Sequence, residues 1–171
     1  MSERNGAITF KGGPLTLVGP ELAVGQAAPD FSLAGNDLSP KTLGDYRGKV
    51  VVLVTVPSLD TPVCDTETRR FNEEASALGD GSVVLAVSVD LPFAQARWCG
   101  AAGVERVQTL SDYKDRRFGQ DYGLFIKELG LLARAVIVID KEGTIRHFEL
   151  VKEVTEEPDY DAALEAAKAA G

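Results

Sequence analysis

Three runs of almost uninterrupted apolar, mostly β-branched residues constrain the fold of this chain more than any other feature. They cover residues 50–56, 83–89 and 135–140. A run that is apolar throughout predicts a strand buried on both faces, whereas a strand with one solvated face alternates apolar and polar residues. Helical patterns at 63–78 and 93–101 follow the first and second runs. This order predicts βα crossovers and therefore parallel pairing between central strands.

Shorter elements complete the predicted architecture. A tight Lys141-Glu142-Gly143 turn joins the third run to residues 144–151, which favours an antiparallel hairpin. We therefore predict the α/β class and a thioredoxin-like fold, with a mixed central sheet flanked by helices and an N-terminal β-hairpin. The other expected elements are the hairpin strands 8–10 and 15–17, a short strand at 31–33, an edge strand at 107–110, a short helix near Phe118 and a closing helix at 158–170.

Composition and charge limit the domain count and the partners. With 171 residues, of which 44% are hydrophobic, the chain is long enough to bury a core without metals or disulfides. We expect one thioredoxin-like domain over residues 1–171. The formal net charge is −8. Such a surface repels phosphate backbones and anionic lipid, so we expect no nucleic acid and no membrane as partners.

The sequence also predicts a cellular compartment. Residues 1–6 are polar, no apolar stretch of signal-peptide character follows them, and no apolar run reaches membrane length. We therefore expect a cytoplasmic protein. Thiols are kept reduced in that compartment, so the two cysteines are either inert core residues or a transient redox pair.

The local context of Cys64 favours a reactive thiol. This residue lies where the first apolar run gives way to a helical pattern, and Thr61 precedes it by three residues. The free N–H groups and the dipole of a helix N-terminus stabilise a thiolate, which is the nucleophilic form of cysteine. The sequence therefore predicts a nucleophilic or redox cysteine, with Cys99 as a second thiol in reserve.

Three segments resemble one family. Residues 57–64 contain the pattern Pro-x-x-x-Thr-x-x-Cys, residues 88–99 read SVDLPFAQARWC, and residues 133–140 read ARAVIVID. Together they resemble the peroxiredoxins, and more narrowly the thiol peroxidase type with two cysteines in one chain. The likeness extends over residues 8–167, nearly the whole sequence.

The resemblance implies a role for each reactive residue. Cys64 would be the peroxidatic cysteine, which becomes a sulfenic acid, and Cys99 would be the resolving cysteine. The two would form an intramolecular redox disulfide. Thr61 and Arg134 would complete the catalytic site. Because the cysteines belong to different predicted helices, we expect disulfide formation to require local unwinding.

Elementary chemistry supports these assignments. Cleavage of an O–O bond by sulfur needs a thiolate, and Arg134 offers a permanent positive charge and planar donors. Thr61 can accept a hydrogen bond from a hydroperoxide, and the backbone N–H groups of Val63 and Cys64 can bind its oxygens. Pro57 would pack over the site and exclude water. We therefore expect Pro57 and Val63 to contact the substrate.

The resemblance also implies the activity and the partners. It implies a thioredoxin-dependent peroxidase that reduces hydrogen peroxide and organic hydroperoxides, contributes to antioxidant defence and redox homeostasis, and forms a homodimer. The sequence adds an apolar cluster at residues 124–126, in a predicted loop, as a possible dimer contact. No cofactor is expected. No metal is expected either, because two cysteines and one histidine lack the spacing of a zinc site.

Less specific interpretations remain open at this stage. Either cysteine could be a small buried hydrophobe, Arg134 a surface charge and Thr61 only a helix N-cap. A disulfide oxidoreductase is disfavoured because Cys64 does not begin a C-x-x-C motif. A Cys-His hydrolase would require His147, which lies in an alternating strand and is interpreted as a structural residue. A redox-sensing module without turnover is the non-enzymatic alternative.

Overall fold

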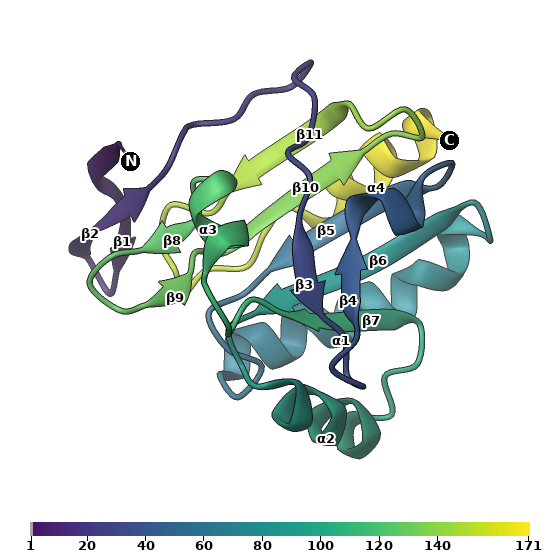
Figure 1. Cartoon of the computed structure of the whole chain (residues 1–171), viewed down its shortest axis with the longest axis horizontal. Coiled ribbons are helices and arrows are strands. Elements are labelled where there is room, and N and C mark those ends of the chain that lie inside the picture. Colours follow the sequence, from purple (N-terminus) through teal and green to yellow (C-terminus); the bar gives the residue numbers. More distant parts are fainter. Residues whose placement is uncertain (1) are drawn as a thin grey trace.

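The structure is a computed structural model that describes residues 2–171, the side chain of residue 76 excepted (Figure 1). Its larger sheet has seven strands, in the order β11-β10-β5-β6-β7-β3-β4, and its smaller sheet has four, in the order β1-β2-β8-β9. The larger sheet consists of β3 (Ser32–Ala34), β4 (Pro40–Thr42), β5 (Val50–Thr55), β6 (Ser82–Ser88), β7 (Val107–Ser111), β10 (Ala135–Ile139) and β11 (Ile145–Leu150). The smaller sheet consists of β1 (Glu3–Phe10), β2 (Gly13–Val18), β8 (Phe125–Ile126) and β9 (Leu131–Leu132).

The three apolar runs form the centre of the larger sheet. Strands β5 and β6 pair in parallel, with Val50 opposite Ser82 and Thr55 opposite Val87. Strand β10 pairs with the other side of β5 in the antiparallel sense and forms the predicted hairpin with β11. All six residues of β5 are buried. The predicted mixed sheet is therefore confirmed.

Successive side chains of β5 point to opposite faces of the sheet, as a strand requires. Val52 and Val54 belong to a core cluster that includes residues of α1 (Pro62–Leu78) and α4 (Tyr160–Ala170), with partly buried residues of α2 (Pro92–Ala102) packed against it. Val51 and Leu53 belong to the opposite cluster, which includes residues of α3 (Arg117–Asp121) and of the smaller sheet. A 3₁₀ turn at Leu43–Tyr46 packs beside that second cluster. Helices thus flank both faces, as predicted.

Two sequence-based expectations were wrong. Strand β7 is not an edge strand, because β3 and β4 extend the sheet beyond it. The apolar residues Leu124 and Ile126 do not form a surface patch, because they are buried in the core. Strand β8 pairs with β2 of the N-terminal hairpin and closes the smaller sheet. Both errors involve pairing between distant segments, which a local pattern does not encode.

Neither a membrane-spanning helix nor a metal-binding cluster is found in the part of the chain that the structure describes. Within residues 2–171, no helix has the length and apolarity needed to cross a membrane. The same stretch holds no group of three or more His, Cys, Asp or Glu side chains arranged to bind a metal ion.

Candidate active site

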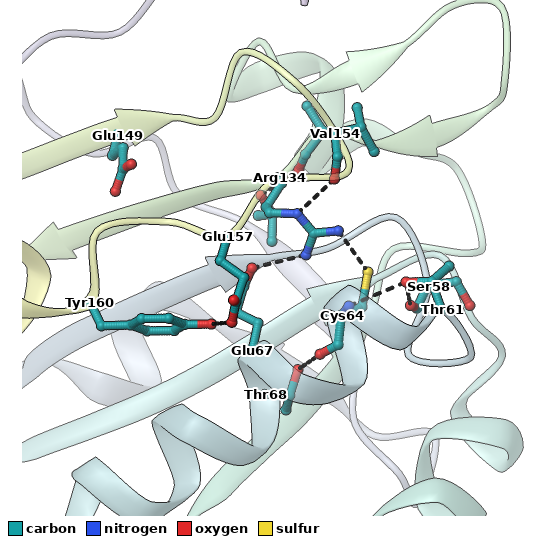
Figure 2. Close-up of polar contacts among 12 residues, drawn as sticks. Ser58, Thr61, Cys64, Glu67, Thr68, Arg134, Glu149, Val154, Glu157 and Tyr160 are labelled. Atoms are coloured by element: carbon teal, nitrogen blue, oxygen red, sulfur yellow. Dashed lines mark hydrogen bonds and ion pairs between the residues drawn. The ribbon is translucent and has the colours of Figure 1, made fainter. Parts of the chain in front are cut away.

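The pairing of β5 with β10 brings the predicted site residues together. Ala135, the first residue of β10, lies opposite Thr55, the last residue of β5. Arg134 therefore stands at the edge where β5 leads into α1. Figure 2 shows its guanidinium pointing toward Cys64, although the two residues are 70 positions apart in the sequence.

Thr61 begins the helix that carries Cys64. Thr61 is the N-cap of α1, Pro62 is the first helical residue and Cys64 lies in the first turn. Proline suits this position, because its fixed φ fits a helix and its missing N–H would have had no partner there. The Thr61 Oγ1 accepts a hydrogen bond from the Cys64 N–H at 3.3 Å and donates one to the Ser58 carbonyl at 3.1 Å. Cys64 thus lies at a helix N-terminus, where the helix dipole favours negative charge.

Arg134 is buried, with an exposed fraction of 1%, and its three nitrogens bind three different acceptors. Its Nε donates to the Val154 carbonyl at 3.0 Å, Nη1 to Glu67 Oε1 at 2.9 Å and Nη2 to Cys64 Sγ at 3.2 Å. The rigid planar guanidinium holds these directions fixed. Cys64 is also fully buried. A buried charge is costly unless it is paired, and the Arg134 guanidinium is the positive charge that contacts the buried sulfur.

Glu67 is a site residue that the sequence analysis missed. Its burial raises its pKa from the ordinary 4.5 to about 7, against the attraction of Arg134, while Glu149 and Glu157 add to the rise. Burial alone would lower the pKa of Arg134, but Glu67 and Cys64 outweigh it and raise that pKa. The guanidinium therefore stays charged. The one sequence signal for Glu67 was its position three residues after Cys64, because residues three apart on a helix lie on the same face.

The titration of Glu67 should make stability depend on pH. Its folded pKa lies above its ordinary value, so the protonated form is favoured by folding. This contribution is complete below pH 4.5 and is lost as pH rises through about 7. We expect the free energy of unfolding, relative to that of Glu67→Gln, to fall between pH 5 and pH 8. Urea unfolding of both proteins at each pH measures this difference, and a constant difference would contradict it.

Pro57 and Val63 are the two residues expected to contact the substrate. Pro57 is buried in the segment between β5 and α1, and Val63 is half-buried in the first turn of the helix. Of the two amides expected to bind peroxide oxygens, that of Cys64 donates to Thr61 Oγ1 instead, whereas that of Val63 is one of the first N–H groups of α1, which have no partner within the helix.

Cys99 lies on α2 and faces a different neighbour. It is half-buried, and its sulfur is 3.5 Å from Thr109 Oγ1 on β7. Neither cysteine is in a disulfide. Side chains nonetheless connect the two cysteine helices, because Asp65 accepts a hydrogen bond from Trp98 Nε1 at 2.9 Å and Arg69 Nη1 donates to the Ala102 carbonyl at 3.3 Å. Side-chain contacts thus hold α1 and α2 together.

The contact between Trp98 and Asp65 provides a spectroscopic signal. Trp98 is the only tryptophan and precedes Cys99, so movement of α2 would change the environment of the indole. We expect the emission spectrum to shift between the reduced and the oxidised protein. Cys99→Ser, which cannot form the disulfide, should show no such shift after one equivalent of peroxide. Identical spectra in the two states, with the disulfide confirmed by mass, would contradict a movement of this helix.

Comparisons with known proteins agree with this fold and site. The Redoxin family model matches residues 23–164, which include every site residue described above. Fold and site therefore define a redoxin. A thiol peroxidase of Bacillus subtilis is 56% identical over 95% of this chain and 96% of its own length. A thiol peroxidase of Halalkalibacterium halodurans is 58% identical, over 96% of this chain and 98% of its own length.

A solved structure extends the comparison. The peroxiredoxin-like protein from Aquifex aeolicus has a TM-score of 0.89 and 46% identity, with 95% of each chain covered. The chain belongs to the redoxin family and, within it, to the thiol peroxidases. The resemblance and the thioredoxin-like fold inferred from the sequence are confirmed.

Proposed function

We propose that this protein reduces hydrogen peroxide and organic hydroperoxides to water and alcohols, with Cys64 as the nucleophile. The observation that carries this proposal is the 3.2 Å contact between Arg134 Nη2 and Cys64 Sγ at the N-terminus of α1. A buried thiolate needs a positive charge beside it, and Arg134, which also pairs with Glu67, supplies one. High identity to thiol peroxidases along nearly the whole chain supports the same chemistry.

The first step transfers one oxygen to sulfur. The Cys64 thiolate attacks the terminal oxygen of ROOH, an S–O bond forms and the O–O bond breaks. The bonding pair leaves on RO⁻, which takes a proton and departs as water or alcohol, while Cys64 becomes a sulfenic acid. Arg134 and the Val63 N–H at the start of α1 stabilise the negative charge as it moves from sulfur to oxygen. Thr61 orients the peroxide hydroxyl.

The second step protects the oxidised sulfur. The Cys99 thiolate attacks the sulfenic sulfur of Cys64, hydroxide leaves and is protonated to water, and a disulfide forms. Without it, Cys64 would proceed irreversibly to sulfinic and sulfonic acids. A dithiol protein of the thioredoxin type then reduces the disulfide by thiol exchange. Placement of the two free cysteines on adjoining helices supports this sequence of steps.

The test is peroxide-dependent NADPH consumption with thioredoxin and its reductase, over peroxides of increasing size. We expect many turnovers per chain with hydrogen peroxide and with alkyl hydroperoxides. Oxidation that stops at one equivalent, with the reductase system active on a control substrate, would instead indicate a redox sensor. Repeated turnover of peroxides would serve antioxidant defence, and that role would fit the expected cytoplasmic location.

We also expect a homodimer, as is typical of this family. A dimer would sediment with twice the 18.2 kDa mass of the chain. Analytical ultracentrifugation at micromolar concentration measures this, in the reduced and the oxidised protein. Sedimentation of only the single chain in both states would contradict the expectation.

A further inference from the structure

Asp90 connects the end of β6 to the segment that precedes Cys64. Its Oδ1 accepts a hydrogen bond from Ser58 Oγ at 2.7 Å, and its Oδ2 accepts one from the Leu59 N–H at 2.9 Å. A third bond comes from Ser88 Oγ, at 2.7 Å from Oδ2. Hydrogen bonds to a carboxylate are stronger than those between neutral groups, so one side chain fixes the loop at two successive residues.

The loop that Asp90 holds determines the orientation of Thr61. The Ser58 carbonyl accepts both the Thr61 N–H, at 3.2 Å, and the Thr61 hydroxyl, at 3.1 Å. The hydroxyl proton is therefore committed to Ser58, one oxygen lone pair accepts the Cys64 N–H, and the second lone pair is left to accept another hydrogen bond. In this orientation Thr61 presents an acceptor, which is what the O–H of a hydroperoxide requires.

The same network reaches the helix of Cys99. Ser88 Oγ accepts a hydrogen bond from Gln95 Nε2 at 3.0 Å, and Gln95 Nε2 also donates to the Leu110 carbonyl at 2.8 Å. Gln95 is fully buried and lies one turn before Cys99 on α2. A continuous chain of hydrogen bonds thus runs from α2 through Ser88 and Asp90 to the loop before Cys64.

We propose that Asp90 is a positioning residue for peroxide reduction: its carboxylate fixes Ser58 and Leu59, and through them holds Thr61 as the acceptor for the peroxide hydroxyl. Asp90 touches neither the sulfur nor the substrate. It acts through Thr61, so the inference rests on the proposed function. Asp90→Asn keeps the volume but replaces one acceptor oxygen by an NH₂ group, which cannot accept the hydrogen bonds of this network.

The experiment compares two reactions of Cys64. Oxidation by hydrogen peroxide needs Thr61 in place, whereas alkylation by iodoacetamide needs the thiolate and access to the buried sulfur but no hydrogen bond to Thr61. We expect Asp90→Asn to slow the single-turnover reaction with peroxide by roughly tenfold to a hundredfold, as misplacement of a reacting group does. The alkylation rate of Cys64, measured in Cys99→Ser background by mass, should change less than about twofold. A role in stability alone would alter both rates together.

Asp60→Asn is the matched control, since it removes the same charge from an exposed residue of the same loop. It should leave both rates unchanged. Ser58→Ala removes one of the two loop contacts of Asp90 and replaces Asp90→Asn in the experiment if that variant does not fold. It should slow the peroxide reaction to a smaller extent and leave the alkylation rate nearly unchanged.

Equal slowing of the peroxide and alkylation reactions in Asp90→Asn, or equal slowing of the peroxide reaction by Asp60→Asn, would overturn the assignment. A wild-type protein inactive toward peroxide would defeat the proposed function, whereas an active one unaffected by Asp90→Asn would defeat only this inference.

Discussion

Cys64→Ser is expected to abolish peroxide reduction, because a serine hydroxyl is not ionised at neutral pH and cannot attack the O–O bond. Cys99→Ser should behave differently. It retains Cys64 together with Thr61 and Arg134, so it should still consume about one equivalent of peroxide per chain. Without a resolving thiol it should then stop, and thioredoxin-linked turnover should be lost.

The measurement is peroxide loss in a single turnover, followed by mass analysis of the peptide that contains Cys64. In Cys99→Ser we expect one added oxygen at low peroxide and two or three at excess. Wild-type protein, in which the disulfide intercepts the sulfenic acid, should resist this over-oxidation. If Cys99→Ser cannot reduce one equivalent, or if Cys64→Ser can, the assignment of the two cysteines is wrong.

The site could be anticipated from the sequence where its residues are local. The spacing of Thr61 and Cys64 after a buried strand predicted an N-capped helix with sulfur in its first turn, and the structure has that arrangement. Arg134 was placed at the start of a central strand, and antiparallel pairing of that strand with β5 accounts for its contact with Cys64. Local chemistry indicated Thr61 and Cys64, whereas the role expected of Arg134 came from the family resemblance.

The supporting residues could not be anticipated in the same way. Glu67 is an ordinary helix residue in the sequence, and its role depends on burial against Arg134. Asp90 acts across two neighbouring strands, because the end of β6 lies beside the loop that follows β5. Strand β7 was misjudged as an edge for a related reason, since its outer neighbour β3 comes much earlier in the chain. In each case the missing information was which distant segments meet.

Arg134→Ala is expected to have the second largest effect on the reaction. It removes the only cation that contacts the sulfur in the described residues, and with it the donor that stabilises the transition state. We expect the first step to slow by roughly 10²-fold or more, as loss of one preorganised donor does in other active sites. Arg134→Lys should be intermediate, because an ammonium keeps the charge but cannot reproduce the planar fork.

A stability effect must be separated from this loss of rate. Removing Arg134 leaves Glu67 buried without its partner, which typically costs about 3–5 kcal/mol. Glu67 can relieve that cost by taking a proton, so Arg134→Ala should be more destabilising at pH 8 than at pH 5. The double variant Arg134→Ala, Glu67→Gln removes the unpaired charge as well. It should recover much of the stability, by urea unfolding at pH 8, while its reaction with peroxide stays slow. Recovery of the rate together with the stability would show that Arg134 supports only the fold, whereas a slow, stable double variant assigns it to the chemistry of Cys64.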